Sequence, residues 1–353
     1  MAYPKRKPAD AGPDEVKALR EAIAADSLAR LYVFHGEETY LRDHYLSEMK
    51  KLLCGELPEL NFELFDGKSC TPEVLREAIL AYPAFGGRRL VVARDCDIIR
   101  ATGGLAALAE ELFPELPDTT TLVFLYDTLE YRLPTDKEKD MLQLVRKHGR
   151  IVDFRRADPP ALEKWVCSHF RALGKECSRE VAQNLIFLSG GLMNDLYPEI
   201  QKIGHFAAGD TITAEDVRTM VIPTVDAKVF EMTDAVLRGD TTLALRELSK
   251  LFATGEEPIM ISAALAKQLR QYYTACVLAA SGWDEGEFAR LTGTKSPYVI
   301  NKFARMARSA DLSRARERMM LCAETDLALK SSGGDRQQLL ELLVLRLAGK
   351  DSL

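Results

Sequence analysis

The stretch Leu31-Tyr-Val-Phe-His-Gly36 decides the fold. An unbroken apolar run that ends in a glycine turn is typical of a buried strand leading into a helix. The pattern returns at Leu90-Val-Val-Ala93 and Leu122-Val-Phe-Leu-Tyr126, and more weakly at Arg150-Ile-Val-Asp-Phe154. Helical patterns lie between these runs, at 39–53, 71–82, 104–112 and 135–148. This alternation predicts an α/β part with a parallel sheet covered by helices.

The chain changes character after Phe154, where the strand pattern stops. Short amphipathic helices follow, and Ile222-Pro223 is a plausible hinge because proline restricts the residue before it. From Val225 to Ala348 the pattern is almost entirely helical. We therefore predict an α/β domain over 1–153, a small helical domain over 154–222 and a larger helical domain over 223–353.

Composition excludes several classes of protein. The 353 residues carry a formal net charge of −6, which argues against binding nucleic acid by bulk positive charge alone. The seven cysteines show no close pairing, so we expect reduced thiols and neither a disulfide framework nor a zinc site. No apolar run is long enough for a transmembrane helix, and the start of the chain has no signal-peptide pattern. We expect a soluble cytoplasmic protein.

The turn after the first strand occupies the position of a nucleotide-binding P-loop, but it lacks the residues that this chemistry needs. Aligning the P-loop template on Gly36 puts Leu41 at the second glycine, Arg42 at the lysine and Asp43 at the hydroxyl residue. Leu41 prevents close backbone approach to a phosphate, and Asp43 has no hydroxyl for a magnesium ion. We interpret Gly36 as a strand-to-helix turn in a degenerate nucleotide site.

Other catalytic patterns are missing as well. Asp95 and Asp127 follow strands, where a Walker B acid would lie, but without a phosphate cradle we interpret them as strand-end or capping residues. The five histidines show no metal-ligand spacing, and there is no nucleophile elbow or dinucleotide fingerprint. We predict no catalytic residue, no metal site and no cofactor.

One loop does not resemble core sequence. Thr71-Pro-Glu73 begins a helix well, Pro83 ends it, and Val74, Leu75, Ala78, Ile79 and Tyr82 form its expected buried stripe. The connection to the next strand is Ala84-Phe-Gly-Gly-Arg-Arg89. Either Phe85 folds back on the sheet, or it is an apolar anchor presented to a partner.

At these residues the chain resembles the δ subunits of bacterial DNA polymerase III. The resemblance is carried in order by Leu31–Leu41, Ala81–Val92, Val229–Asp240, Gly255–Pro258 and Asp326–Lys330. It implies a degenerate AAA+ module, a helical lid and a helical collar. It also implies a subunit that binds and opens the sliding clamp during DNA replication without hydrolysing ATP, as a non-catalytic part of the polymerase holoenzyme.

The resemblance also assigns roles to residues. Ala84 and Phe85 match the apolar pair that enters a pocket on the clamp, although Ala84 replaces a residue that is more often bulky. Arg88 and Arg89 are expected to steer the loop toward an acidic clamp surface. Asn194 stands where active relatives carry a nucleotide-sensing lid arginine, and no Ser-Arg-Cys motif supplies an arginine finger.

Partners follow from the same resemblance. The collar is implied to pack beside the motor and delta-prime subunits, with primer-template DNA inside the assembled loader and no membrane. Five leucines of the last helical segment form a wide apolar set, which suggests burial on more than one side: Leu339, Leu340, Leu342, Leu343 and Leu345.

Two other functions stay open from the residues alone: an active AAA+ motor subunit, and a helical adaptor outside replication. The altered loop at 36–43 argues against the motor. The segment 295–318 has an excess of positive charge that could face nucleic acid, acidic neighbours or only solvent. Its cations are Lys295, Lys302, Arg305, Arg308, Arg314, Arg316 and Arg318.

Overall fold

The computed structural model describes residues 14–55, 58–67, 69–132, 135, 139–331 and 335–349. The chain divides into two compact units, Met1–Ala157 (unit 1) and Asp158–Leu353 (unit 2). The predicted boundary at 153 lies close to the division between the units, whereas the predicted boundary at 222 falls inside unit 2. The three-domain division stays a prediction.

Unit 1 contains a five-stranded parallel sheet in the order β2-β3-β4-β1-β5. Its strands are β1 (Leu31–His35), β2 (Phe62–Asp66), β3 (Arg89–Arg94), β4 (Thr120–Leu125) and β5 (Arg150–Asp153). Its helices are α1 (Asp14–Ala24), α2 (Thr39–Cys54), α3 (Pro58–Asn61), α4 (Pro72–Leu80), α5 (Gly103–Leu112), the short 3-10 helix η1 (Phe113–Glu115) and α6 (Lys139–His148). The predicted α/β class with a parallel sheet is confirmed.

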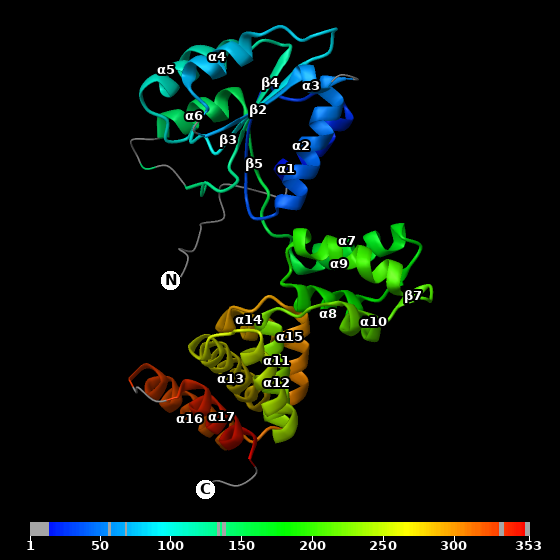
Figure 1. Cartoon of the computed structure of the whole chain (residues 1–353), viewed down its shortest axis with the longest axis vertical. Helices are drawn as coiled ribbons and strands as arrows, with labels where there is room; N and C mark the ends of the chain where they lie inside the picture. Colours follow the sequence, from blue (N-terminus) through cyan, green and yellow to red (C-terminus); the bar gives the residue numbers. More distant parts are fainter. Residues whose placement is uncertain are drawn as a thin grey trace. The chain divides into compact units, whose positions relative to one another are not determined.

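Helices cover both faces of this sheet. Figure 1 shows α4, α5 and α6 on one side and α1, α2 and α3 on the other. Each side has its own apolar core, one built around Leu75 and Leu108 and the other around Met49 and Leu53. Strands β1, β3 and β4 lie between two neighbours and are buried on both faces, which explains their continuous apolar sequences.

Four elements of unit 1 were not predicted from the sequence: α1, β2 and the short helices α3 and η1. Strand β2 is at the edge of the sheet and half exposed, so its sequence, Phe-Glu-Leu-Phe-Asp, has no unbroken apolar run like those of the inner strands. Helix α4 also ends earlier than predicted, at Leu80, because the residues before Pro83 adopt extended backbone.

Unit 2 is helical. It contains α7 (Pro159–Ala172), α8 (Arg179–Ser189), α9 (Met193–Phe206), α10 (Ala214–Met220), α11 (Val225–Arg238), α12 (Thr241–Ala253), α13 (Pro258–Ser281), α14 (Glu285–Thr292), α15 (Pro297–Ala307), α16 (Leu312–Ser331) and α17 (Arg336–Ala348). The short strands β6 (Glu176–Cys177) and β7 (Thr211–Ile212) pair in parallel. Among the described residues, no helix is long and apolar enough to cross a membrane.

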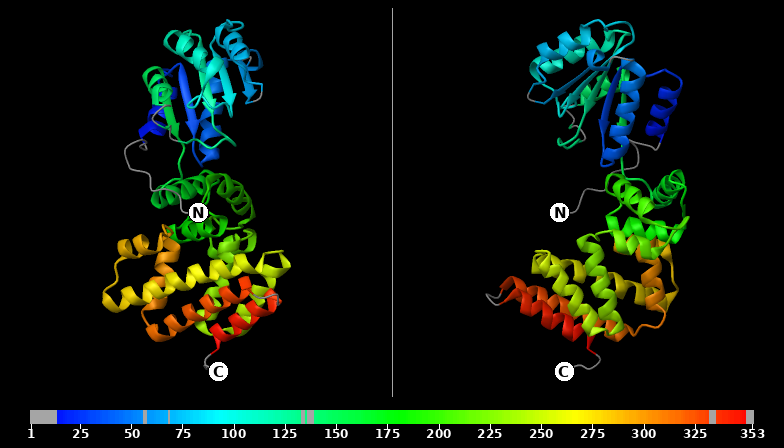
Figure 2. Two further views of the ribbon diagram at one scale, coloured as in Figure 1. Left: turned by 90° about the vertical axis from the view of Figure 1, so that its left-hand side faces the viewer. Right: turned by 45° about the vertical axis from the view of Figure 1, so that its right-hand side comes forward.

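The early and late helices of unit 2 pack together. Phe187 of α8 lies 5.1 Å from Phe230 of α11 and 4.7 Å from Tyr298 of α15, measured between ring centroids. The backbone N–H of Thr224 donates to the carbonyl of Leu188 at 3.0 Å. Figure 2 shows α16 and α17, in orange-red and red, running side by side at the end of the chain.

Arg318 of α16 connects two of these helices from inside. Its guanidinium is buried and donates to the carbonyl of Leu347 at 3.0 Å and to that of Val236 at 3.3 Å. Both carbonyls belong to the last turns of their helices, α17 and α11, where intrahelical donors run out. The Val236 carbonyl also accepts from the backbone N–H of Gly239 at 3.1 Å. Burial lowers the pKa of Arg318 from its ordinary value.

Replacing Arg318 with methionine should therefore destabilise unit 2. The apolar volume is largely kept, but the Leu347 carbonyl loses its side-chain donor, which costs about 1–3 kcal/mol for a buried unsatisfied group. The Val236 carbonyl keeps its hydrogen bond from the Gly239 N–H. Urea denaturation followed by circular dichroism measures the loss. Arg316→Met, on the exposed side of the same helix, is the matched control and should change stability by less than about 0.5 kcal/mol. Equal stability of the two variants would contradict this role of Arg318.

Candidate functional site

The turn between β1 and α2 closes against the end of β5. Gly36 has φ of +124°, and a Cβ there would lie 2.4 Å from the carbonyl oxygen of Phe154. The backbone N–H of Glu38 donates to that same oxygen at 2.8 Å. Only glycine fits this position, so the role of Gly36 as a strand-to-helix turn follows from backbone contact within the protein.

Arg42, at the position of the P-loop lysine, is bound by groups of the protein itself. The residue is 3% exposed, and its guanidinium forms ion pairs with Asp127 at 2.6 Å and with Asp43 at 3.1 Å. It also donates to the carbonyl of Tyr126 at 3.2 Å. Leu41 packs against the apolar core on the α2 side of the sheet. The cation and the residue at the second-glycine position are thus both engaged in the structure of unit 1.

Asp95 caps the loop after β4. Its carboxylate accepts hydrogen bonds from the Thr128 hydroxyl at 2.6 Å and from the backbone N–H groups of Asp127, Thr128 and Leu129. Partial burial acts to raise the pKa of Asp95, but these hydrogen bonds outweigh it and lower the pKa below its ordinary value. The interpretation of Asp95 as a strand-end capping residue is confirmed.

Asn194 lies in unit 2, exposed near the start of α9. Gly36, Leu41, Arg42 and Asp43 all belong to one segment of unit 1. Among the described residues, no group of three or more histidine, cysteine, aspartate or glutamate side chains is placed to hold a metal ion.

The loop between α4 and β3, residues 81–88 and hereafter the anchor loop, displays Phe85. This side chain is 90% exposed, so the alternative that it folds back on the sheet is wrong. Phe85, Gly86 and Gly87 have φ of +54°, +82° and +86° in succession. A left-handed φ is costly for phenylalanine, and a strained residue on a fixed loop is a frequent feature of functional sites.

Apolar exposure continues beyond Phe85. Tyr82 is also 90% exposed, and Leu80 at the end of α4 is exposed as well. The prediction that Tyr82 belongs to the buried stripe of this helix is wrong, because α4 ends before it and extended backbone turns its side chain outward. Ala84, between these residues, is half-buried.

Arg88, the last residue of the anchor loop, and Arg89, the first residue of β3, differ in exposure. Arg89 is 5% exposed and forms an ion pair with Glu63 of β2, so it offers no charge to a partner and its expected steering role is corrected. Arg88 is partly exposed and pairs with Asp26. Its backbone N–H donates to the carbonyl of Leu53 at 2.9 Å, which fixes the exit of the loop.

Asn61, the last residue of α3, holds the other side of the anchor loop. Its side-chain nitrogen donates to the carbonyl of Ala84 at 3.1 Å, and its side-chain oxygen accepts from the Ala84 N–H at 2.8 Å. Sequence analysis did not identify this residue. No local pattern could have done so, because its partner lies far along the chain and is backbone.

Three of the seven cations in the basic segment 295–318 bind other groups inside unit 2. Lys302 pairs with Asp234 at 3.0 Å and lies over the ring of Phe230, and Arg314 donates to the carbonyl of Gly349 at 2.6 Å. With Arg318 buried, the exposed cations of the segment are Lys295, Arg305, Arg308 and Arg316.

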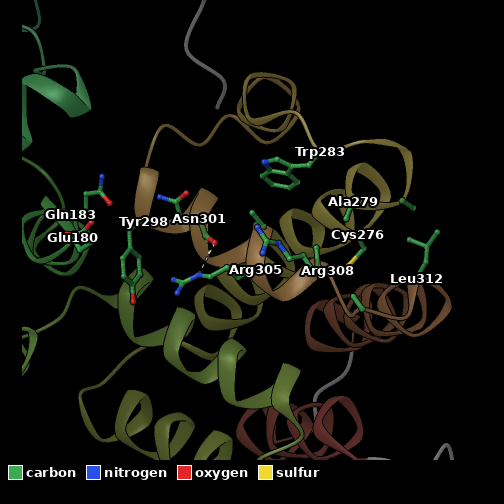
Figure 3. Close-up of a pocket in the computed structure, with 14 residues that line it drawn as sticks. Glu180, Gln183, Cys276, Ala279, Trp283, Tyr298, Asn301, Arg305, Arg308 and Leu312 are labelled. Carbon is green, nitrogen blue, oxygen red and sulfur yellow. Dashed lines mark hydrogen bonds between the residues drawn. The ribbon is translucent and has the colours of Figure 1, made fainter.

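Two of these exposed arginines line a pocket of about 920 Å³ between α8, α13 and α15. Figure 3 shows Arg305 and Arg308 at this pocket together with Trp283 and Tyr298. Arg305 donates to the carbonyl of Asn301 at 3.3 Å, drawn as a dashed line. The pocket combines cationic and aromatic side chains.

The chain is similar in sequence to DNA polymerase III delta subunits. Residues 226–347 match the family model for the C-terminal domain of the DNA polymerase III delta subunit. The chain is 24% identical over 330 residues to DNA polymerase III subunit delta of Bacillus subtilis (strain 168), covering 90% of this chain and 92% of that protein. It is 26% identical over 281 residues to a probable DNA polymerase III subunit delta of Aquifex aeolicus (strain VF5), covering 78% of each.

A solved structure shares the fold. The Bacillus subtilis DNA clamp loader delta protein superposes with a TM-score of 0.54 at 22% identity, covering 94% of this chain and 99% of that one. The sequence matches run through both units, and the family model covers most of α11 to α17. The chain is therefore similar to DNA polymerase III delta subunits along most of its length, and residues 226–347 match their C-terminal domain.

Proposed function

We propose that the chain is the delta subunit of a DNA polymerase III clamp loader, and that it binds the sliding clamp through its anchor loop and opens it for loading onto primed DNA. The observation that carries the proposal is the almost complete exposure of Phe85 on a loop held at both sides. An apolar side chain in water favours transfer to a partner pocket, and a fixed loop loses little entropy on binding.

The exposed surface at the end of α4 and on the anchor loop is mainly apolar. Phe85, Tyr82 and Leu80 are exposed, whereas Arg89 is buried and Arg88 is already paired with Asp26. Because the nearby charges are neutralised within unit 1, the affinity for the clamp should depend only weakly on salt concentration. This replaces the salt-dependent steering that the sequence suggested for the arginines.

The subunit acts without ATP binding of its own in this proposal. Three features support it: Leu41 packs into the core, Arg42 is paired with Asp127, and Asp43 has no hydroxyl for a magnesium ion. The rival function, an active motor subunit, would need Arg42 to leave these partners and bind phosphate.

The isolated protein should therefore show no specific binding of ATP. Fluorescence anisotropy with a labelled ATP analogue measures this, with the motor subunit of the same loader as the positive control. Binding at micromolar concentration that unlabelled ATP competes away would contradict the proposal and favour the motor.

Assembly with the motor and delta-prime subunits is proposed for the helices after residue 223. In α17, Leu340 and Leu343 are buried inside unit 2, while Leu342 and Leu345 are exposed. The exposed pair is three residues apart and so lies on one face of the helix. Apolar side chains on both sides of one helix support burial against a neighbouring subunit.

Contact with primer-template DNA in the assembled loader stays part of the proposal. The cations available for it in the segment 295–318 are the four exposed ones, of which Arg305 and Arg308 line the pocket of unit 2. A helical adaptor outside replication is disfavoured by the match of residues 226–347 to the delta-subunit family model. Retention of the purified full-length chain on its immobilised cognate clamp tests the function as a whole.

A further inference from the structure

The side chain of Asn61 forms hydrogen bonds with the backbone of the anchor loop in the way that a neighbouring strand would. It is 2% exposed, and its amide forms two hydrogen bonds with the backbone of a single residue, Ala84. One bond satisfies the Ala84 N–H and the other its carbonyl, which is the pairing that a neighbouring strand provides in a sheet. Ala84 directly precedes Phe85.

Little else holds this part of the loop. Pro83 has no N–H to donate. Within the part of the chain that the structure describes, the Asn61 pair is the only hydrogen bonding that ties residues 82–87 to the rest of unit 1. The left-handed backbone of Phe85 is disfavoured for an L-residue, so the loop needs an external contact to stay in this conformation.

We propose that Asn61 is a positioning residue for clamp binding. Its side chain selects the one conformation of the anchor loop that presents Phe85. This inference rests on the proposed function. Without the Asn61 amide, only a fraction of molecules would hold Phe85 correctly, and the apparent affinity falls by that fraction.

The test compares full-length variants for clamp affinity by surface plasmon resonance, with the melting temperature measured on each. Asn61→Ala removes both hydrogen bonds and should weaken binding by roughly 10-fold while the melting temperature changes little. Asn61→Asp gives a more specific signature, because a carboxyl group replaces the amide with almost the same shape. Asn184→Asp on α8 is the matched control.

The protonation state of the introduced aspartate decides the outcome. When ionised, its carboxylate still accepts from the Ala84 N–H but repels the Ala84 carbonyl. When protonated, its O–H donates to that carbonyl and both bonds return. Burial raises the pKa of such a carboxyl group, so the affinity of Asn61→Asp should recover by roughly 3-fold or more between pH 8 and pH 5.

The surrounding groups do not produce this recovery by themselves. Among the residues that the structure describes, the titratable or charged groups around Asn61 are Lys50 and Cys54 of α2, Glu59 of α3, Glu63 of β2, and Arg88 and Arg89 beside the loop. Burial raises the pKa of Cys54, so it stays a thiol over this range. Wild type and Asn184→Asp at the same pH values account for titration of the clamp.

The inference is overturned if Asn61→Ala binds the clamp with wild-type affinity. It is also overturned if the loss of clamp affinity is accompanied by a matching fall in melting temperature. An Asn61→Asp variant whose affinity changes with pH no more than that of wild type overturns it as well. Phe85→Ala, measured in parallel, separates the two proposals. If Phe85→Ala binds weakly and Asn61→Ala binds normally, only the role of Asn61 fails; if Phe85→Ala also binds normally, the anchor loop is not the clamp site.

Discussion

Phe85→Ala should weaken clamp binding by roughly 30- to 1,000-fold, which corresponds to about 2–4 kcal/mol. A buried phenylalanine removes roughly 150–250 Å² of surface from water, and at about 25 cal/mol/Å² this gives an upper bound near 4–6 kcal/mol. Truncation to alanine keeps the β-carbon and some contact, so the measured loss should be smaller. Isothermal titration calorimetry with the purified clamp measures it.

The same variant should leave the folded state unaffected. Phe85 is exposed in the free protein, so its removal opens no cavity, and alanine carries the same left-handed backbone strain as phenylalanine. Phe206→Ala, an exposed aromatic of α9, is the matched control and should retain wild-type affinity. A fall in the melting temperature of Phe85→Ala with unchanged affinity would refute the anchor.

The double variant Leu342→Glu/Leu345→Glu should abolish co-elution with the motor and delta-prime subunits in size-exclusion chromatography. Both side chains are exposed in the free chain, so the carboxylates stay in water there. In an assembled interface they would be buried without partners, which costs several kcal/mol. Clamp binding by the anchor loop in unit 1 should be retained.

Surface substitution is a better test of assembly than removal of the helices after residue 222. Phe187 of α8 packs against Phe230 and Tyr298, so a truncation there would expose part of the core of unit 2. Leu291→Glu, at an exposed leucine of α14, is the matched control and should still co-elute. Full co-elution of the α17 double variant would locate assembly on another surface.

The sequence predicted the elements that depend on local pattern. Strands β1, β3 and β4 were predicted because burial on both faces requires unbroken apolar runs. The edge strand β2 was missed for the same reason, since one free edge and half exposure leave it without such a run. Gly36 was predicted as a turn because the chain has to leave the buried strand before α2 begins.

The altered nucleotide loop was also visible in the sequence, because a P-loop needs particular residue types at a fixed spacing. What Arg42 does instead was not visible. Its partner Asp127 is far away in the chain, and only the parallel pairing of β1 with β4 brings the ends of the two strands together.

By itself, then, the sequence determined the α/β and helical parts, the loss of the P-loop residues and the unusual loop around Phe85. Tertiary structure alone decided which side chains of that loop meet solvent. Phe85 and Tyr82 are exposed, and Arg89 is buried against Glu63. It also decided that Asn61 holds the loop. Local periodicity records how a residue relates to its own helix or strand, whereas these contacts join segments that only the folded sheet brings within hydrogen-bonding distance.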